Sequence, residues 1–263
     1  MRGSVLACFT MLVAMLAADS AIGRSDATNA PACVRELFEG DAFLVCRYVP
    51  GRDEIRLERR GSDGKPGSLA ELEKALGADR QRVRFAMNAG MYDPKRRPLG
   101  LYVAQGSEDR PLDRDTGAGN FYMLPNGVFW VDGEGAPHVD ESEAFAVSGA
   151  KPVWATQSGP LLLRAGALHP AITENGPSRH IRNGVGILGG QALFVISESE
   201  VSFGRLARFF RDGLGCADAL YLDGTVSSLW VPALGRQDKR SDLGTFLVVL
   251  RAKGDGPQRK QPD

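Results

Sequence analysis

Short apolar runs separated by glycine, proline or polar residues dominate the hydrophobic pattern of this chain. Runs of roughly four to eight such residues are typical of β-strands. They predict strands over residues 42–49, 55–59, 83–87, 101–104, 127–131, 160–163, 185–188, 192–196, 219–222 and 245–250. Pro50-Gly51 separates the first two runs, which indicates a hairpin there.

Two stretches carry helical signals instead. Ser68 and Glu71 have the spacing of a capping box, in which the two side chains bond to first-turn amides, and they predict a short helix over 69–76. Apolar residues within 203–214 fall largely on one helical face, and Gly215 follows them. This pattern predicts a second helix, which packs on a sheet.

The balance of strands and helices favours an α+β fold class, a single sheet-rich domain with two or more β-sheets covered by a few helices. The chain has 263 residues, 43% of them hydrophobic, which is enough for one well-filled core. The domain is expected over 31–252, and the polar tail 253–263 is expected to be disordered. Lys plus Arg and Asp plus Glu both number 32, so no net field attracts nucleic acid or an anionic membrane.

The N-terminus has the pattern of a secretory signal. Arg2 precedes an apolar stretch over 5–18, and small residues follow at 20–23. The stretch is too short for a typical membrane span. We therefore expect residues 1–23 to be a signal peptide, the protein to be secreted or periplasmic in a bacterium, and no stable membrane insertion after signal removal.

Cysteine usage agrees with an oxidising compartment. Signal removal leaves Cys33, Cys46 and Cys216, an odd number. A disulfide between Cys33 and Cys46 is favoured because both lie in the early segment, where a short loop can close. The alternative is three buried free thiols. Without any CxxC pair, a cysteine metal site has little support.

Four polar segments follow predicted strands and carry the candidate chemistry. They supply amides, two guanidiniums, hydroxyls and a carboxylate, which together could hold a phosphorylated, hydroxyl-rich ligand. The segments are Asn88-Ala-Gly-Met-Tyr92, Gln157-Ser-Gly-Pro160, Arg179-His-Ile-Arg-Asn183 and Leu222-Asp-Gly-Thr-Val-Ser-Ser228.

Each key side chain has a functional and a structural interpretation. Arg179 and Arg182 suit a phosphate because a guanidinium donates two parallel hydrogen bonds, but they equally fit a solvated basic turn. Asp223 follows a strand and could point a carboxylate into a cleft, or simply form an Asp-Gly turn. Asn88 could bind a ligand or form an Asx turn. Glu198 or Glu200 could add a second carboxylate, and simple solvation in a loop is favoured for Glu200 over Glu198.

Three other chemistries find less support. Residues 184–189 match GxGxxG, but a strand rather than a helix follows, which predicts a hairpin with glycine turns. His138, His169 and His180 are isolated from one another, which argues against a zinc hydrolase. Ser158 lacks the first glycine of a GxSxG nucleophile elbow.

Taken in order, the four segments resemble elements of the phosphodiester glycosidase family, which includes the domain of the mannose 6-phosphate uncovering enzyme. Residues 88–92 and 98–100 resemble its Asn-x-Gly-aromatic segment with a trailing Pro-x-Gly. Residues 157–160 resemble its Gln-x-Gly-Pro turn, and 179–186 resemble its Arg-x-x-x-Gly-x element. Residues 222–228 resemble its Leu-Asp-Gly-Gly-Gly-Ser signature.

The resemblance extends over residues 85–250, with two departures. Thr225 and Val226 stand where the signature usually has two glycines, which restricts the approach of a ligand to the backbone. Met91-Tyr92 replaces a pair of phenylalanines.

The resemblance implies a hydrolase that cleaves a sugar from a sugar-1-phosphodiester and needs no cofactor. Arg179 and Arg182 would hold the phosphodiester, Asp223 would act at the sugar as base or charge stabiliser, and Asn88 with Gln157 would bind hydroxyls. The same segments add further binding residues: Gly90, Asn183, Gly224, Ser227 and Ser228. Glu198 would be a reserve acid. The partner would be a sugar phosphodiester or phosphorylated glycan, and not nucleic acid.

Two alternatives remain open. One is a non-catalytic carbohydrate-binding or envelope polysaccharide assembly module, which the Thr225-Val226 departure favours. The other is a phosphodiesterase in which Asp93, Asp223 and Glu198 hold calcium or magnesium, since these ions prefer oxygen ligands.

Overall fold

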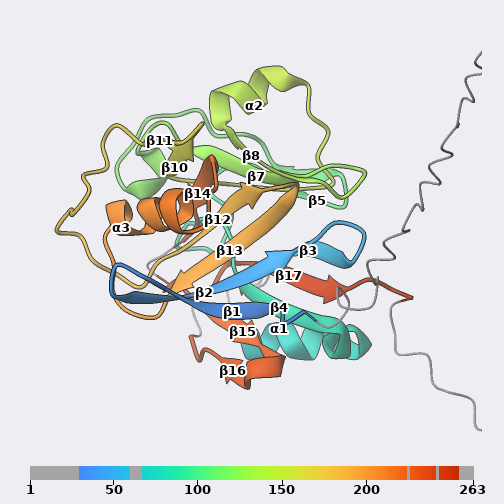
Figure 1. Ribbon diagram of the computed structural model, residues 1–263. Coiled ribbons are helices and arrows are strands. Elements are labelled where there is room, and N and C mark those ends of the chain that lie inside the picture. Colours follow the sequence, from blue (N-terminus) through green and yellow to red (C-terminus); the bar gives the residue numbers. More distant parts are fainter. Residues whose placement is uncertain (1–29, 60–66, 224–225, 241–242, 255–263) are drawn as a thin grey trace, which may run out of the picture. The chain divides into compact units, whose positions relative to one another are not determined.

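Three antiparallel β-sheets build the computed structural model, which describes residues 30–59, 67–223, 226–240 and 243–254 (Figure 1). The expected signal peptide, most of the expected tail, Gly224 and Thr225 lie outside these residues. All elements below belong to the unit Pro31–Asp263.

The largest sheet has seven strands, in the order β1-β2-β13-β12-β14-β10-β11. The strands are β1 (Cys33–Phe38), β2 (Asp41–Tyr48), β13 (Gln191–Ser197), β12 (Asn183–Leu188), β14 (Asp218–Tyr221), β10 (Leu161–Arg164) and β11 (Ala167–Leu168). Strands β12 and β13 follow each other in the chain and form a hairpin. Its turn residues, Gly189 and Gly190, have φ angles of 55° and 74°. The GxGxxG segment is therefore part of a hairpin, as its sequence context predicts.

The other two sheets have five strands each. The second sheet, in spatial order, contains β16 (Arg236–Gln237), β15 (Leu229–Val231), β4 (Val83–Asn88), β17 (Thr245–Arg251) and β3 (Asp53–Arg59). The third contains β6 (Ser107–Arg110), β5 (Tyr102–Ala104), β9 (Trp154–Ser158), β7 (Gly127–Val131) and β8 (Pro137–Glu141).

The three sheets share one buried core. Phe194 of β13, Phe85 of β4 and Phe129 of β7 come from the three different sheets and are all fully buried. The Phe194 ring centroid lies 5.6 Å from that of Phe85 and 5.4 Å from that of Phe129. Aromatic contacts of this kind dominate core energetics because each ring removes a large apolar area from water.

Both predicted helices are present. The first has the predicted bounds, and the second is only partly α-helical. In α1 (Leu69–Leu76), the Ser68 hydroxyl accepts a hydrogen bond from the Glu71 amide, as expected for an N-cap. The second predicted helix begins as α3 (Phe203–Arg208) but continues as a π-helical segment, Phe209–Gly213. The structure adds α2 (Ser142–Ser148), which the hydrophobic pattern did not indicate. Short 3-10 segments cover Gly77–Arg82, Asn120–Tyr122 and Pro232–Leu234.

A disulfide joins Cys33 and Cys46, which lie opposite each other on β1 and β2. The sequence prediction of this pairing is confirmed, and Cys216 is a buried free thiol. The sheet-rich α+β fold class is likewise confirmed. None of the helices in the described residues has the length and hydrophobicity that a membrane span requires.

Candidate functional site

Two buried asparagines, Asn88 and Asn183, tie the polar segments together; we call them the asparagine pair. The Asn88 Oδ1 accepts hydrogen bonds from the Ser228 amide at 2.9 Å and from the Asn183 Nδ2 at 3.0 Å. The Asn88 Nδ2 donates to the Asp223 carbonyl at 2.6 Å. Both asparagines are fully buried. Their amides therefore position backbone inside the protein rather than contacting a ligand directly.

Backbone hydrogen bonds complete the same junction. The Asp223 amide donates to the Ala89 carbonyl at 3.2 Å, and the Leu222 amide donates to the Asn183 carbonyl at 3.1 Å. Asn88 ends β4, Asn183 begins β12 and Asp223 follows β14, so elements far apart in sequence meet here. The Asn88 side chain thus bonds to the backbone of both Asp223 and Ser228.

The two serines of this segment have different environments. The Ser228 hydroxyl is buried and donates to the Val226 carbonyl at 2.9 Å, which closes the segment on itself. The Ser227 hydroxyl is half-buried and lies 3.0 Å from the Ile181 carbonyl. Ser227 faces a pocket, whereas Ser228 supports the fold of the segment.

The pocket beside Ser227 has a volume of about 340 Å³; we call it the arginine pocket. It is lined by His180, Ile181, Glu200, Ser227, Arg236, Asp238 and Arg240. Arg236 donates to both carboxylate oxygens of Asp238, at 3.0 and 2.9 Å. The two guanidiniums of this pocket can bind an anionic group, and the Asp238 and Glu200 carboxylates of the same lining balance part of their charge.

Sequence reasoning missed Arg236, Asp238 and Arg240. They lie in and after β16, which pairs with β15 directly downstream of the 222–228 segment. Asp238 Oδ2 accepts a hydrogen bond from the Leu229 amide at 2.9 Å, which fixes this hairpin. These residues belong to no recognised motif and look like an ordinary polar loop in the sequence. Their nearness in sequence to Ser227 and Ser228 was the one signal that could have identified them.

Glu200, rather than Glu198, reaches the arginine pocket. His180 and Val201 exchange backbone hydrogen bonds of 3.2 and 2.8 Å, and Arg179 donates to the Glu200 carbonyl at 2.8 Å. These bonds bring Glu200 beside His180. The Glu198 carboxylate instead pairs with Arg35 on β1 at 2.6 Å, outside the pocket. Of the two glutamates, Glu200 lines the arginine pocket and Glu198 does not.

Arg182 is buried, which does not fit the expected phosphate contact. Its Nε donates to the Val201 carbonyl at 2.8 Å, one Nη to the Tyr221 hydroxyl and the other to the Ser178 carbonyl, both at 3.0 Å. The guanidinium carbon lies 3.7 Å from the centre of the Phe203 ring. Burial lowers the pKa of Arg182. Arg182 holds the 178–182 segment in place, while Arg179 is exposed beside it.

Gln157 and Gly90 are also structural in this geometry. The Gln157 carboxamide is buried and accepts from the amides of Leu101 and Asp113, at 3.0 and 2.9 Å. A side-chain carbon at Gly90 would lie 2.5 Å from the Gln157 carbonyl oxygen, so only glycine lets this segment approach β9. Both residues therefore position backbone.

The three carboxylates of the metal alternative do not form a group. Asp93 accepts hydrogen bonds from the amides of Lys95 and Arg97, at 2.8 and 3.0 Å, and pairs with the Arg97 side chain. Burial alone would raise the pKa of Asp93, but these bonds outweigh it and lower that pKa. Glu198 is paired with Arg35. Within the described part of the chain, no group of three or more His, Cys, Asp or Glu side chains could hold a metal ion.

Comparisons with known proteins give a consistent family signal. The family model for phosphodiester glycosidase matches residues 81–250. The uncharacterized protein YigE of Escherichia coli (strain K12) is 36% identical over 204 residues, 77% of this chain and 79% of that protein.

Two solved structures share the fold. One is the catalytic domain of zebrafish N-acetylglucosamine-1-phosphodiester alpha-N-acetylglucosaminidase, auto-inhibited by pro-peptide. It has a TM-score of 0.59 and 13% identity, over 86% of this chain and 85% of that one. The other is a hypothetical protein from Synechocystis, with a TM-score of 0.51 and 14% identity, over 84% of this chain and 61% of that one.

Proposed function

The chain belongs to the phosphodiester glycosidase family, and from this premise we propose that it hydrolyses the bond between the anomeric carbon of a sugar and a phosphodiester. The observation that carries this proposal is the asparagine pair. It holds Asp223 and the Ser227 segment at one junction, and Ser227 lines the arginine pocket. These contacts support a mechanism in which the Asp223 carboxylate acts on a ligand whose phosphate lies in the arginine pocket.

The arginine pocket supplies the phosphate part of the mechanism. The guanidinium groups of Arg236 and Arg240 would bind the phosphate, and His180 and Ser227 line the same pocket. In this proposal guanidiniums clamp the phosphate, as the sequence led us to expect, but Arg236 and Arg240 take the role expected of Arg182. Arg179 is exposed at the neighbouring segment and can add to the clamp.

Asp223 would act on the sugar side. Water attacks the anomeric carbon, the bond from that carbon to the phosphate oxygen breaks, and the phosphate leaves with the bonding electrons. The Asp223 carboxylate takes the proton from the attacking water, and Glu200 stabilises positive charge at the ring. Because phosphate is a good leaving group, clamping its charge removes much of the need for a strong general acid.

An assay with a defined diester tests this proposal. We expect the purified protein to release free sugar from the methyl diester of N-acetylglucosamine 1-phosphate. Asp223→Asn should lower turnover by about a hundredfold or more, since positioned bases contribute factors of this size, with little change in thermal midpoint. Glu200→Gln should lower turnover as well, whereas Glu198→Gln, which removes only an exposed ion pair, should not. Full activity in Asp223→Asn would disprove the assignment.

The second candidate, a non-catalytic glycan-binding module, rested on Thr225 and Val226. Val226 is buried in a cluster with Trp230 and Phe246, so this side chain fills core rather than the pocket. The buried position of Val226 weakens the argument that this departure from the family signature has removed catalytic activity. In the same assay, saturable binding of the diester without release of sugar would favour the module.

Secretion is part of the proposal as well. Its support is the charge and apolar pattern of residues 1–23, which lie outside the described residues. Sequencing the N-terminus of the protein isolated from the periplasm tests it. Cleavage near Gly23 is expected, and an intact Met1 on cytoplasmic protein would contradict it.

A further inference from the structure

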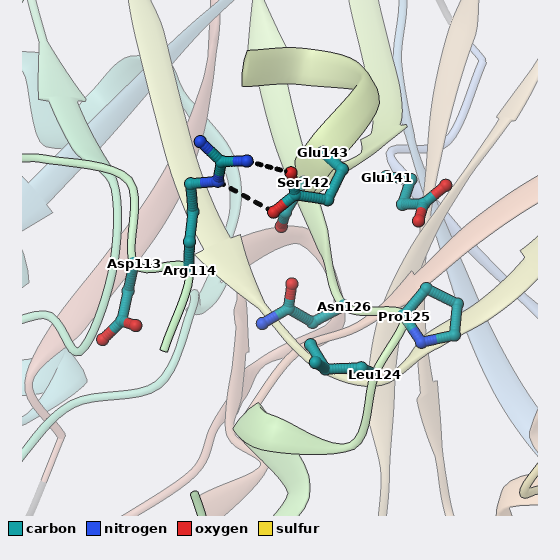
Figure 2. A pocket seen from close by; sticks show the side chains of 8 residues that line it. All are labelled: Asp113, Arg114, Leu124, Pro125, Asn126, Glu141, Ser142 and Glu143. Carbon is teal, nitrogen blue, oxygen red and sulfur yellow. Dashed lines mark hydrogen bonds and ion pairs between the residues drawn. The ribbon is translucent and has the colours of Figure 1, made fainter. Parts of the chain in front are cut away.

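We propose that a second pocket, beside α2, is a binding site for a neutral saccharide. We call it the α2 pocket; it has a volume of about 310 Å³ (Figure 2). The argument uses five lining residues: Arg114, Leu124, Asn126, Ser142 and Glu143. None of the residues lining this pocket lines the arginine pocket.

The floor of the α2 pocket is built from buried polar groups. Ser142 and Asn126 are 4% and 2% exposed. The Ser142 amide donates to the Asn126 carbonyl at 3.1 Å, so the two residues are fixed side by side. The Asn126 Nδ2 donates to the Phe121 carbonyl at 3.0 Å, which leaves the Asn126 Oδ1 as an acceptor facing the pocket (Figure 2). A fixed buried amide oxygen is a specific partner for a ligand hydroxyl.

Gln157 fixes this pocket from beneath. Its Nε2 donates to the Ser142 hydroxyl at 3.1 Å and to the Asp113 carbonyl at 2.7 Å. Because the Ser142 oxygen accepts this bond, its own O–H can donate into the pocket. Asp113 directly precedes Arg114, so the same glutamine also fixes the backbone next to Arg114. The Gln-Ser-Gly-Pro segment therefore organises the α2 pocket rather than the arginine pocket.

The walls determine the class of ligand. On one side, the Arg114 Nε donates to a Glu143 carboxylate oxygen at 2.9 Å, and a second bond makes the pair bidentate. Both side chains are more than half exposed, so both can still reach a ligand. On the opposite side, Leu124 is 49% exposed and adjoins Pro125, which gives an apolar wall (Figure 2).

This combination suits a pyranose ring. Neighbouring hydroxyls can donate to Glu143 and accept from Arg114, a further hydroxyl can donate to the Asn126 Oδ1, and the C–H face can cover Leu124. The Arg114–Glu143 and Arg164–Glu141 ion pairs each balance their own charge, and the Asp113 carboxylate, which also lines the pocket, accepts hydrogen bonds from the Asp115 amide and the Tyr122 hydroxyl. The lining therefore has no surplus positive charge for an anion, in keeping with a neutral ligand. The inference does not depend on the proposed hydrolysis, since binding here requires no turnover.

Nuclear magnetic resonance of the ¹⁵N-labelled full chain tests the site directly. Methyl α-glucopyranoside and methyl N-acetyl-α-glucosaminide are added in separate titrations, with glycerol as the acyclic polyol arm. We expect a glycoside to shift the amides of residues 113, 114, 124, 126 and 141–143 in a saturable manner. Response to glycerol alone, or no saturable shift at these amides with either glycoside, would overturn the proposal.

Two variants and a control locate the contacts. Glu143→Ala should weaken glycoside binding about tenfold, because a charge-assisted hydrogen bond is lost. Leu124→Ser should weaken it several-fold by removing the apolar wall. Glu108→Ala is the matched control. Glu108 is an exposed glutamate on β6, in the same sheet as β8, and it does not line the α2 pocket, so this variant should bind normally. Equal weakening in all three variants, or in none, would contradict the assignment.

Inorganic phosphate separates this inference from the proposed function. It should shift residues 180–181, 227 and 236–240 and leave the α2 pocket unchanged. A missing phosphate response would count against the arginine pocket alone.

Discussion

At the scale of single residues, Arg179 and Arg182 have different environments although they lie only three positions apart. Arg179 is exposed, whereas Arg182 donates to two backbone carbonyls and the Tyr221 hydroxyl inside the protein. The sequence led us to expect both guanidiniums at a ligand site, and the structure leaves the Arg179 side chain exposed. The sequence could not predict which guanidinium is buried, because the deciding partners, Phe203 and Tyr221, come from α3 and β14.

A lysine exchange distinguishes the two roles. Arg182→Lys should lower the free energy of unfolding by about 2 kcal/mol or more, because lysine cannot reach all three acceptors and leaves buried groups unpaired. Arg179→Lys, the matched exposed exchange, should change it by less than about 0.5 kcal/mol. Urea unfolding measures both. Unchanged stability in Arg182→Lys together with lost phosphate binding would restore Arg182 as a phosphate ligand.

At the scale of elements, sequence periodicity located most strands but not the α3 irregularity. Phe209 and Phe210 begin a π-helical segment, and both side chains are buried. Phe210 packs over Gly184 and Gly186 of β12. The wider π-helical turn lets these rings reach the sheet, a requirement set by tertiary packing that helical periodicity does not reveal. The packing of Phe210 also explains why Gly184 and Gly186 of the GxGxxG match are glycines, with no need for a bound nucleotide.

Gly186→Ala tests this packing. The added carbon would lie 2.7 Å from the Phe210 Cδ1 and 2.9 Å from the Cys216 Sγ, so the ring must move. We expect a loss of about 1 to 3 kcal/mol in unfolding free energy, as for other overpacked cores. Gly133→Ala, where the new carbon meets open space, is the control and should be nearly neutral. Calorimetric midpoints of the two variants decide the matter, and equal midpoints would contradict the packing argument.

At the scale of the whole molecule, strands distant in sequence pair to create the site. Asn88 ends β4 in the second sheet, and Asn183 begins β12 in the first, yet their side chains share a 3.0 Å hydrogen bond. The sequence indicated that these segments carry polar groups at strand ends. It could not indicate that Gln157 organises a different pocket, because that depends on how β9 packs beside Ser142 and Asp113.

Global stability should also depend on one buried histidine. His169 is 3% exposed, and its Nδ1 accepts from the Ala171 amide at 3.1 Å. Burial lowers its pKa from the ordinary 6.5, although the carbonyls of Leu124, Met123 and Pro125 act in the opposite direction. Protonation is therefore more favourable in the unfolded chain than in the folded one. Above pH 6.5 both states are neutral and His169 has no effect on stability.

Below this pH the unfolded chain takes up the proton first, so stability falls as pH falls. The limiting slope from one such group is about 1.4 kcal/mol per pH unit. We expect the unfolding free energy of the wild type to fall more steeply from about pH 6.5 to 5 than that of His169→Gln. Carboxylates titrate in both proteins, so the difference between the two curves isolates His169. Parallel curves would show that its pKa is the same in both states, against the burial that the structure gives it.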